Sequence, residues 1–456
     1  MSRLLLSLGL ASSMLVSTLG AQARPRHEEF TLGNGLRVIL LEDHSTPVVT
    51  VDIWYRVGSR NEQLGRTGLA HVFERLMFRG SEHVADGQHY QLVDAVGGET
   101  TANTTEDRAA FAETLPSNQL ALGLWLEADR MRSLKITDQA FASQRDAVKQ
   151  ERQMRVDNQP YGSAFLDGVT TAFDSAACFP YAHSAMGSLD DLEGTELSDV
   201  QAFFQLHYTP SRATLTVVGD FEPAEARRLI QSYFADIPRG APVPDVSCGV
   251  NYAVGEKTRQ WQDPLANLPA VIVAYRTPAH ADPDSRALQL LALVIGQGEG
   301  SRLQRALVRE EHVAVQAASG LDSRAGPGIL FAYAIAAQGV NVEDAKKALS
   351  AQVARAGIDV TQAELDRARN QFRATSLMGR QTTAQMAEEL QHFALFHSSA
   401  NEIATDLDQY AAVTLADLRR VAARYLTPPN STTLVVLPIG GGGAAPPGDH
   451  PHQEDQ

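Results

Sequence analysis

The chain is poor in cysteine and in positive charge, and after its first residues it has no long apolar run. Its 456 residues include two cysteines, Cys178 and Cys248, which are too few for a disulfide framework or a thiolate zinc site. We expect two unpaired thiols, with one bridge as the alternative in an oxidising compartment. The formal net charge is −15 and no Lys/Arg-rich run occurs, which argues against a nucleic-acid binder.

The apolar run at the start has the layout of an export signal. Arg3 precedes an apolar stretch from Leu4 to Leu19, and Ala21-Gln22-Ala23 follows as a cleavage signal. A membrane anchor is the alternative, but the run contains serine and glycine and is short for a span. We therefore predict a cleaved signal peptide at residues 1–23 and an exported protein, periplasmic or secreted, with no membrane span after cleavage.

The chain contains the same pattern twice. A helix-like stretch, a Thr-Pro turn and a strand occur at residues 196–218 and again at 414–437, with Asp199 and Asp417 offset by 218 positions. Trp54-Tyr55-Arg56 and Ala274-Tyr275-Arg276 also match, at an offset of 220. Matches at nearly one offset indicate a duplication into two homologous domains rather than a solenoid.

Strands and helices interleave in each half without a Rossmann glycine fingerprint, which favours an α+β fold with two homologous α/β sandwich halves. Strands are expected at 36–41, 48–55 and 331–337, the first two adjacent, and helices at 68–79, 118–134 and 342–356. The predicted domains are residues 24–238 and 263–440, joined by a Pro/Gly-containing linker at 239–262 and followed by a disordered tail at 441–456.

The most informative stretch is Ala70–Gly80. It reads as an inverted zinc-peptidase helix, His-x-x-Glu-His, in which the second histidine is Arg75. Positions 71 and 75 share one helix face, where two neutral imidazoles would bind a metal and Glu74 would activate its water. A guanidinium has no lone pair to donate.

Further stretches extend this likeness: Gly97-Gly98, Thr104–Asp107, Leu124–Met131 and Pro180–Gly187. With them, essentially the whole mature chain resembles the family of pitrilysin, insulin-degrading enzyme and the mitochondrial processing peptidase. The resemblance implies the fold of paired sandwich halves, zinc chemistry and peptide substrates. It also implies a metal set of His71 and Glu151, the latter 76 positions after Arg75, with Glu74 as general base. Gln144 stands where the family usually has another glutamate.

The resemblance also implies substrate-binding residues. Ala102, Asn103 and Thr104 match the family's active-site edge strand, along which an extended peptide can add. Arg309 matches an arginine that helps hold the substrate, but Gln316 replaces the tyrosine seven positions later. His83 and His89, which follow the motif, are expected to be solvated loop histidines rather than replacement ligands.

We expect Arg75 to pair with Glu151 or Glu74 in place of a metal, so zinc is possible but is not expected at this site. The favoured function is an inactive partner subunit that helps an intact zinc-peptidase homologue bind and cleave peptides, as a heterodimer or by self-association. Two alternatives stay open: an active zinc metalloendopeptidase with a substituted ligand, and a structural core-type subunit.

Overall fold

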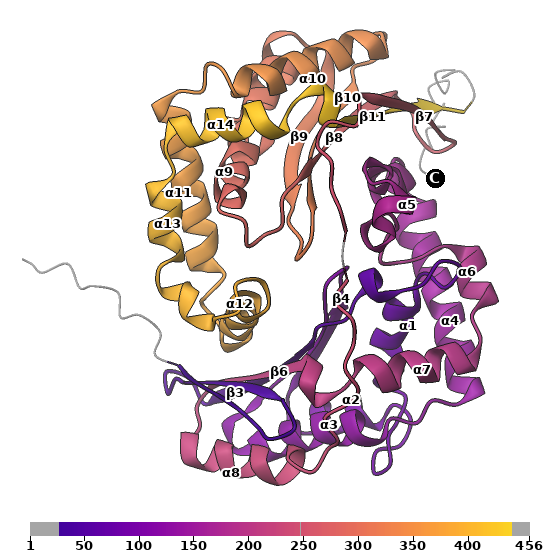
Figure 1. Cartoon of the computed structure of the whole chain (residues 1–456), viewed down its shortest axis with the longest axis vertical. Helices are drawn as coiled ribbons and strands as arrows, with labels where there is room; N and C mark the ends of the chain where they lie inside the picture. The colour runs from indigo at the N-terminus through magenta and orange to yellow at the C-terminus, as the bar shows by residue number, and fades with distance from the viewer. Residues whose placement is uncertain (1–26, 247, 440–456) are drawn as a thin grey trace, which may run out of the picture.

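A computed structural model describes residues 27–246 and 248–439, which form two mixed α/β halves (Figure 1). The strands are β1 Glu28–Thr31, β2 Arg37–Glu42, β3 Val48–Tyr55, β4 Glu99–Thr104, β5 Ala109–Pro116, β6 Ala213–Gly219, β7 Lys257–Asp263, β8 Ala270–Thr277, β9 Ala314–Asp322, β10 Gly328–Ala336 and β11 Ser431–Pro438. The α-helices are α1 Leu69–Leu76, α2 Gln88–Ala95, α3 Leu120–Ser133, α4 Asp138–Arg152, α5 Ser175–Cys178, α6 Leu189–Gly194, α7 Leu197–His207, α8 Pro223–Phe234, α9 Asp284–Gly296, α10 Val342–Ala356, α11 Gln362–Met378, α12 Thr383–Phe396, α13 Asp406–Ala412 and α14 Leu415–Tyr425.

The first sheet has the strand order β1-β2-β6-β3-β5-β4 within the described residues. Strands β2 and β3 are therefore not neighbours, and the predicted adjacency is wrong. The late strand β6 enters between them, parallel to β2 and antiparallel to β3. A strand that arrives more than 150 residues later in the chain leaves no local signal in the sequence around β2 and β3.

The second sheet repeats the centre of the first. Its order is β7-β11-β8-β10-β9, so β11 again lies beside the early strand β8. Trp54 pairs with Thr214 in the first sheet, and Ala274 pairs with Thr432 in the second. The two offsets seen in the sequence, 220 and 218, thus connect structurally equivalent pairs. The predicted two-half α+β architecture is confirmed.

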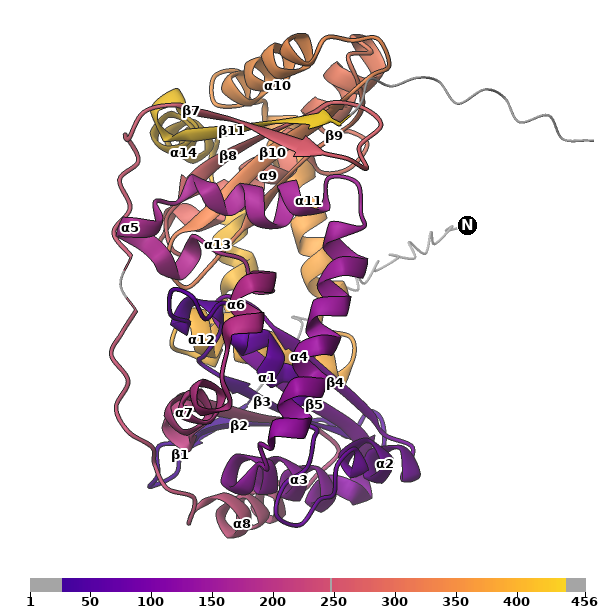
Figure 2. The same ribbon diagram turned by 90° about the vertical axis from the view of Figure 1, so that its right-hand side faces the viewer.

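Most predicted elements are present with small shifts of their ends. The strand at 48–55 and the helix at 342–356 match β3 and α10, whereas the motif helix α1 ends at Leu76, short of the predicted residue 79. The predicted signal peptide and tail lie outside the described residues. The linker boundaries stay a prediction, and the segment before β7 runs along one side of the molecule (Figure 2).

Each half covers part of the other half's sheet. Helix α12, from the second half, packs Leu390 and Phe393 against Ile39 and Val218 of the first sheet. In return, the segment 164–181 of the first half packs on the second sheet, where Ala164, Val169 and Phe173 meet Ile272 and Leu434. Figure 1 shows α12 directly above β6 and α5 beneath the second sheet. The apolar core is therefore shared across the two halves.

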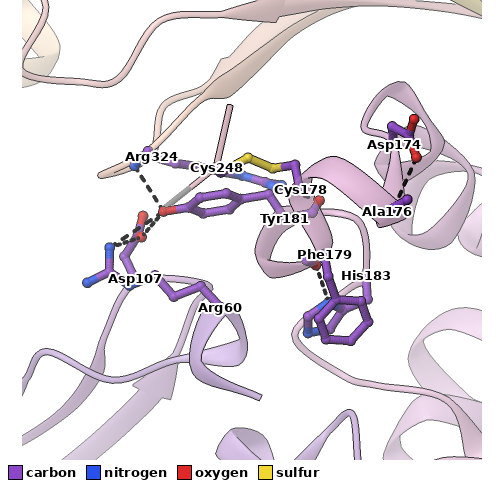
Figure 3. The surroundings of a disulfide bond; sticks show 11 residues. Arg60, Asp107, Asp174, Ala176, Cys178, Phe179, Tyr181, His183, Cys248 and Arg324 are labelled. Atoms are coloured by element: carbon purple, nitrogen blue, oxygen red, sulfur yellow. Dashed lines mark hydrogen bonds and ion pairs between the residues drawn. A yellow bond between two sulfur atoms is a disulfide. The ribbon is translucent and has the colours of Figure 1, made fainter. Parts of the chain in front are cut away.

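A disulfide between Cys178 and Cys248 ties α5 to the linker (Figure 3). The expectation of two unpaired thiols is wrong. The sequence separation of 70 residues hid the pairing, which exists because the linker returns past α5. No helix in the described part of the chain is long and apolar enough to cross a membrane.

Buried polar contacts join the halves next to this disulfide. Asp107 accepts hydrogen bonds from the Tyr181 hydroxyl at 2.8 Å and from the backbone N–H of Ala325 at 2.7 Å, and it pairs with Arg60. Arg324 reaches back from the second half to Glu106 at 3.2 Å. Figure 3 shows Tyr181 and Asp107 in contact beneath the bridge. These contacts fix the position of the loop that follows β4.

Candidate active site

Helix α1 is held at its N-terminus by a buried carboxylate. Glu62 accepts hydrogen bonds from the backbone N–H groups of Gly68, at 2.9 Å, and Ala70, at 2.7 Å. A negative charge at this end also complements the helix dipole. His183 lies 3.2 Å from Glu62; burial alone lowers its pKa, but the bonds to Glu62 raise the pKa of His183 overall. This pair orients the motif helix from outside the motif.

The side chains that match the family's metal set come together, and Arg75 lies among them. Arg75 donates from Nη2 to Oε2 of Glu151 at 2.5 Å, and the Nε2 atom of His71 lies 3.2 Å from the same oxygen. The other Glu151 oxygen is 2.8 Å from Arg155 Nη1. Both carboxylate oxygens are therefore occupied by cationic or imidazole nitrogens, as the expectation of an Arg75 ion pair requires.

The charges in this cluster favour protonation of the histidine. Burial lowers the pKa of His71, but hydrogen bonds and charge from Glu74, 3.5 Å from Nδ1, and from Glu151 raise it overall. Burial similarly raises the pKa of Glu151, while Arg75 and His71 lower it overall. Two neighbouring carboxylates favour the protonated imidazolium form of a histidine, and this form has no lone pair for a metal.

The side chains at this site do not fit a catalytic zinc ion. Such an ion needs three protein ligands and an open position. Among the described residues, no third His, Cys, Asp or Glu brings a ligand atom within 4.8 Å of those of His71 and Glu151 together. Gln144 lies about two turns before Glu151 on α4, and its side chain donates to the Ser143 hydroxyl at 3.4 Å. The Glu151 oxygen that a metal would need is already bound by Arg75.

The candidate peptide-binding strand β4 lies at an edge of the first sheet and beside α1. Within residues 27–246 and 248–439, Ala102, Asn103 and Thr104 pair with β5 on one side only. The Asn103 side chain accepts a hydrogen bond from Arg108, whose guanidinium stacks 3.8 Å above the Trp54 ring. β4 is thus an edge strand to which an extended peptide can add, and it contacts the motif helix α1.

In the second half, Arg309 does not meet the motif helix. It pairs with Glu299 on an exposed surface, its side chain 54% accessible, and no ion pair joins it to the described part of the first half. Gln316 on β9 donates to the hydroxyl of Tyr333 at 2.8 Å. A tyrosine hydroxyl thus lies beside the position where the sequence lacks one, but it comes from the neighbouring strand β10.

Known protein families match both halves of the chain. The family model described as Insulinase (Peptidase family M16) matches residues 37–173, and the one described as Peptidase M16 inactive domain matches residues 196–372. The chain belongs to the M16 insulinase family. The resemblance seen in the sequence is thereby confirmed.

Relatives of M16 type match along nearly the full chain. "Zinc protease PqqE" of Helicobacter pylori is 29% identical over 94% of this chain and 98% of its own length. The solved "protease from Helicobacter pylori" is 28% identical, covers 91% of this chain and 100% of its own, and superposes with a TM-score of 0.85. A "peptidase M16 inactive domain from Pseudomonas fluorescens" gives a TM-score of 0.81 at 17% identity, covering 92% of this chain and 99% of its own, which supports the fold alone.

Several residues at this M16-type site escaped the sequence analysis. Glu62 and His183 precede and follow the motif at a distance, although His183 lies in a stretch, Pro180–Gly187, already quoted for the resemblance. The expectation of a solvated loop histidine is wrong for His89, which is buried in α2 and lies 2.9 Å from Glu113. It holds for His83, whose exposed ring pairs with Asp129.

Proposed function

We propose that this chain is an exported, catalytically idle M16 subunit that binds peptides beside an intact zinc-peptidase homologue. The observation that carries the proposal is the ion pair of 2.5 Å between Arg75 and Glu151. A guanidinium near a dication is repelled by about 4 kcal/mol per unit charge at 4 Å in an effective dielectric of about 20. Glu74 keeps its general-base position but has no metal-bound water to activate.

Peptide binding is supported by the free edge of β4. A strand that adds there gains backbone hydrogen bonds without any metal chemistry. A synthetic extended peptide labelled for fluorescence anisotropy tests this part of the proposal. The proposal expects binding of this peptide and no binding of a backbone N-methylated copy, which lacks the donors of a strand. Equal affinity for both peptides contradicts strand addition.

The partner role is tested by recovery of the native protein from its source, followed by identification of co-purifying chains. An intact His-x-x-Glu-His homologue in a stoichiometric complex supports the proposal. Peptidase activity should belong to that complex and should survive Glu74→Gln in this chain, because Glu74 is idle here. Loss of activity with this substitution overturns the proposal.

An active zinc endopeptidase is the second candidate. It is favoured by the likeness to "Zinc protease PqqE" over nearly the full length of both chains. Chelator-sensitive cleavage by the purified chain alone, abolished by Glu74→Gln, supports this candidate and excludes the idle-subunit proposal. The same two assays thus separate the two functions.

A further inference from the structure

Three histidines far from the motif helix come together between the halves. His280 lies in the loop that follows β8, whereas His392 and His397 lie on α12 and directly after it. One ring nitrogen from each lies within 4.8 Å of those of the other two. Imidazole nitrogen is a preferred ligand for zinc, copper and nickel.

The distances suit one shared ion. With a metal–nitrogen bond of about 2.1 Å, two tetrahedral ligands lie about 3.4 Å apart. The Nε2 atoms of His280 and His392 are 3.2 Å apart. A shared proton can join these two rings, and a metal ion can join them both to His397.

A second contact orients the central ring. Nδ1 of His280 lies 2.8 Å from the Ser323 hydroxyl, and its backbone N–H donates to the Arg324 carbonyl at 2.8 Å. A partner on one ring nitrogen turns the other toward a metal, as outer hydrogen bonds do in known metal sites. Sequence spacing gives no hint of this, because Ser323 lies 43 positions from His280.

The rings are also in the protonation state that coordination needs. Burial lowers the pKa of His280 to about 4 and holds the pKa of His392 well below its usual range. Burial also lowers the pKa of His397. Neutral imidazoles can bind a metal at pH 7 without first losing a proton.

The nearby cations are paired with acids. Arg286 lies 3.6 Å from Asp406, and Arg108 lies 3.3 Å from Glu388. Glu389 and Asp406 line the same cavity of about 510 Å³ as His280 and His392. Because each arginine is paired with an acid, its positive charge near the three histidines is partly neutralised. Arg75, by contrast, contacts the candidate ligand Glu151 itself.

We propose that His280, His392 and His397 form a divalent transition-metal site of the zinc, nickel or copper class. The ion connects the loop after β8, in the second sheet, to a helix that packs on the first sheet. All three ligands belong to the second half, and the site is independent of the proposed function. The site that the family motif implies and this site use no residue in common.

Cobalt binding to the full chain, freed of metal by chelation and carrying no histidine tag, tests the proposal. We expect one Co²⁺ per chain with the visible absorption of a low-symmetry, four-coordinate ion. His392→Ala and His397→Ala should each abolish it, and Ser323→Ala should weaken it by about 10- to 100-fold. Two matched controls, His71→Ala at the motif helix and His44→Ala in the exposed group with Glu42 and Glu222, should leave it unchanged.

Three results overturn the proposal: no Co²⁺ bound, Co²⁺ lost with either control variant, or Co²⁺ kept after His392→Ala. Circular dichroism checks that each variant is folded. If His392→Ala does not fold, His397→Ala decides, because His397 lies beyond the last residue of α12. Thermal unfolding gives a second readout: added Zn²⁺ should raise the Tm of the wild type and not that of His397→Ala.

Discussion

Histidine occurs at two candidate metal sites in this chain, once at the motif helix and three times beside α12, and the groups around them differ in charge. At the motif helix, His71 lies between two carboxylates, and Arg75 holds the Glu151 oxygen. Between the halves, three imidazoles face one another with their cationic neighbours already paired. If both proposals hold, the charge around a histidine, rather than its place in a motif, decides whether it can bind a metal.

Replacing the guanidinium is the strongest way to break this contrast. Arg75→His should tighten Zn²⁺ binding at the motif helix by at least roughly 1,000-fold, because about 4 kcal/mol of repulsion per unit charge of the dication is removed and a ligand is gained. The measurement is isothermal titration in a His392→Ala background, so that only the motif site is counted. Arg79→His, one turn further along and paired with Asp86, is the matched control. Unchanged affinity means that the pocket has diverged beyond position 75.

Removing the carboxylate tests the ion pair itself. Glu151→Gln should lower the free energy of unfolding by about 2 kcal/mol at pH 7, less than for a fully buried pair because the Arg75 side chain is 37% exposed. The pKa of Glu151 is lowered in the fold, so its contribution is present above its unfolded pKa and is lost as the pH falls through the folded value. Denaturant unfolding of both proteins at pH 7 and pH 3.5 should show the difference shrinking in acid. A constant difference contradicts the ion pair.

The two histidine sites should respond to pH with opposite signs. The pKa of His71 is raised, so its stabilisation is complete below its unfolded pKa, about 6.5, and is lost as the pH rises through the folded value. The pKa of His280 is lowered to about 4, so the fold loses stability as the pH falls from about 6.5 toward that value. Tm profiles of metal-free His71→Gln and His280→Gln against wild type should diverge at opposite ends of the range. Parallel profiles contradict the assignment of the two charge states.

The smallest expected effect concerns a buried carboxyl group, Asp52, whose charge state also depends on its surroundings. Burial under α12 raises the pKa of Asp52 well above its usual range, and its Oδ1 atom has no hydrogen-bond partner among the described residues. Asp52→Asn should stabilise the fold by about 1 kcal/mol at pH 8, because no buried charge can form, and by little at pH 4. Thermal unfolding measures this, with the exposed Asp94→Asn as control. Destabilisation at pH 8 indicates that the carboxylate is needed.

Features that depend on residue spacing along the chain could be predicted from the sequence. The helical step from His71 to Arg75 and the count to Glu151 placed three contacting residues correctly, and the repeated Thr-Pro turns marked equivalent strands. The sequence could not show contacts between segments that lie far apart along the chain. β6 enters between β2 and β3, Cys248 meets Cys178, and His280 meets His392 across 112 positions. Each of these pairings is set by how the chain folds back on itself, for which one sequence contains no periodic signal.

The exchange of covering segments between the halves has a consequence for synthesis. Ile39 and Val218 receive their apolar cover from Leu390 and Phe393, which leave the ribosome long after the first sheet is complete. Until then, one apolar face of the nascent first half stays exposed to solvent and prone to aggregation. Cutting the chain in the linker should therefore yield two pieces that dissolve only when they are made together.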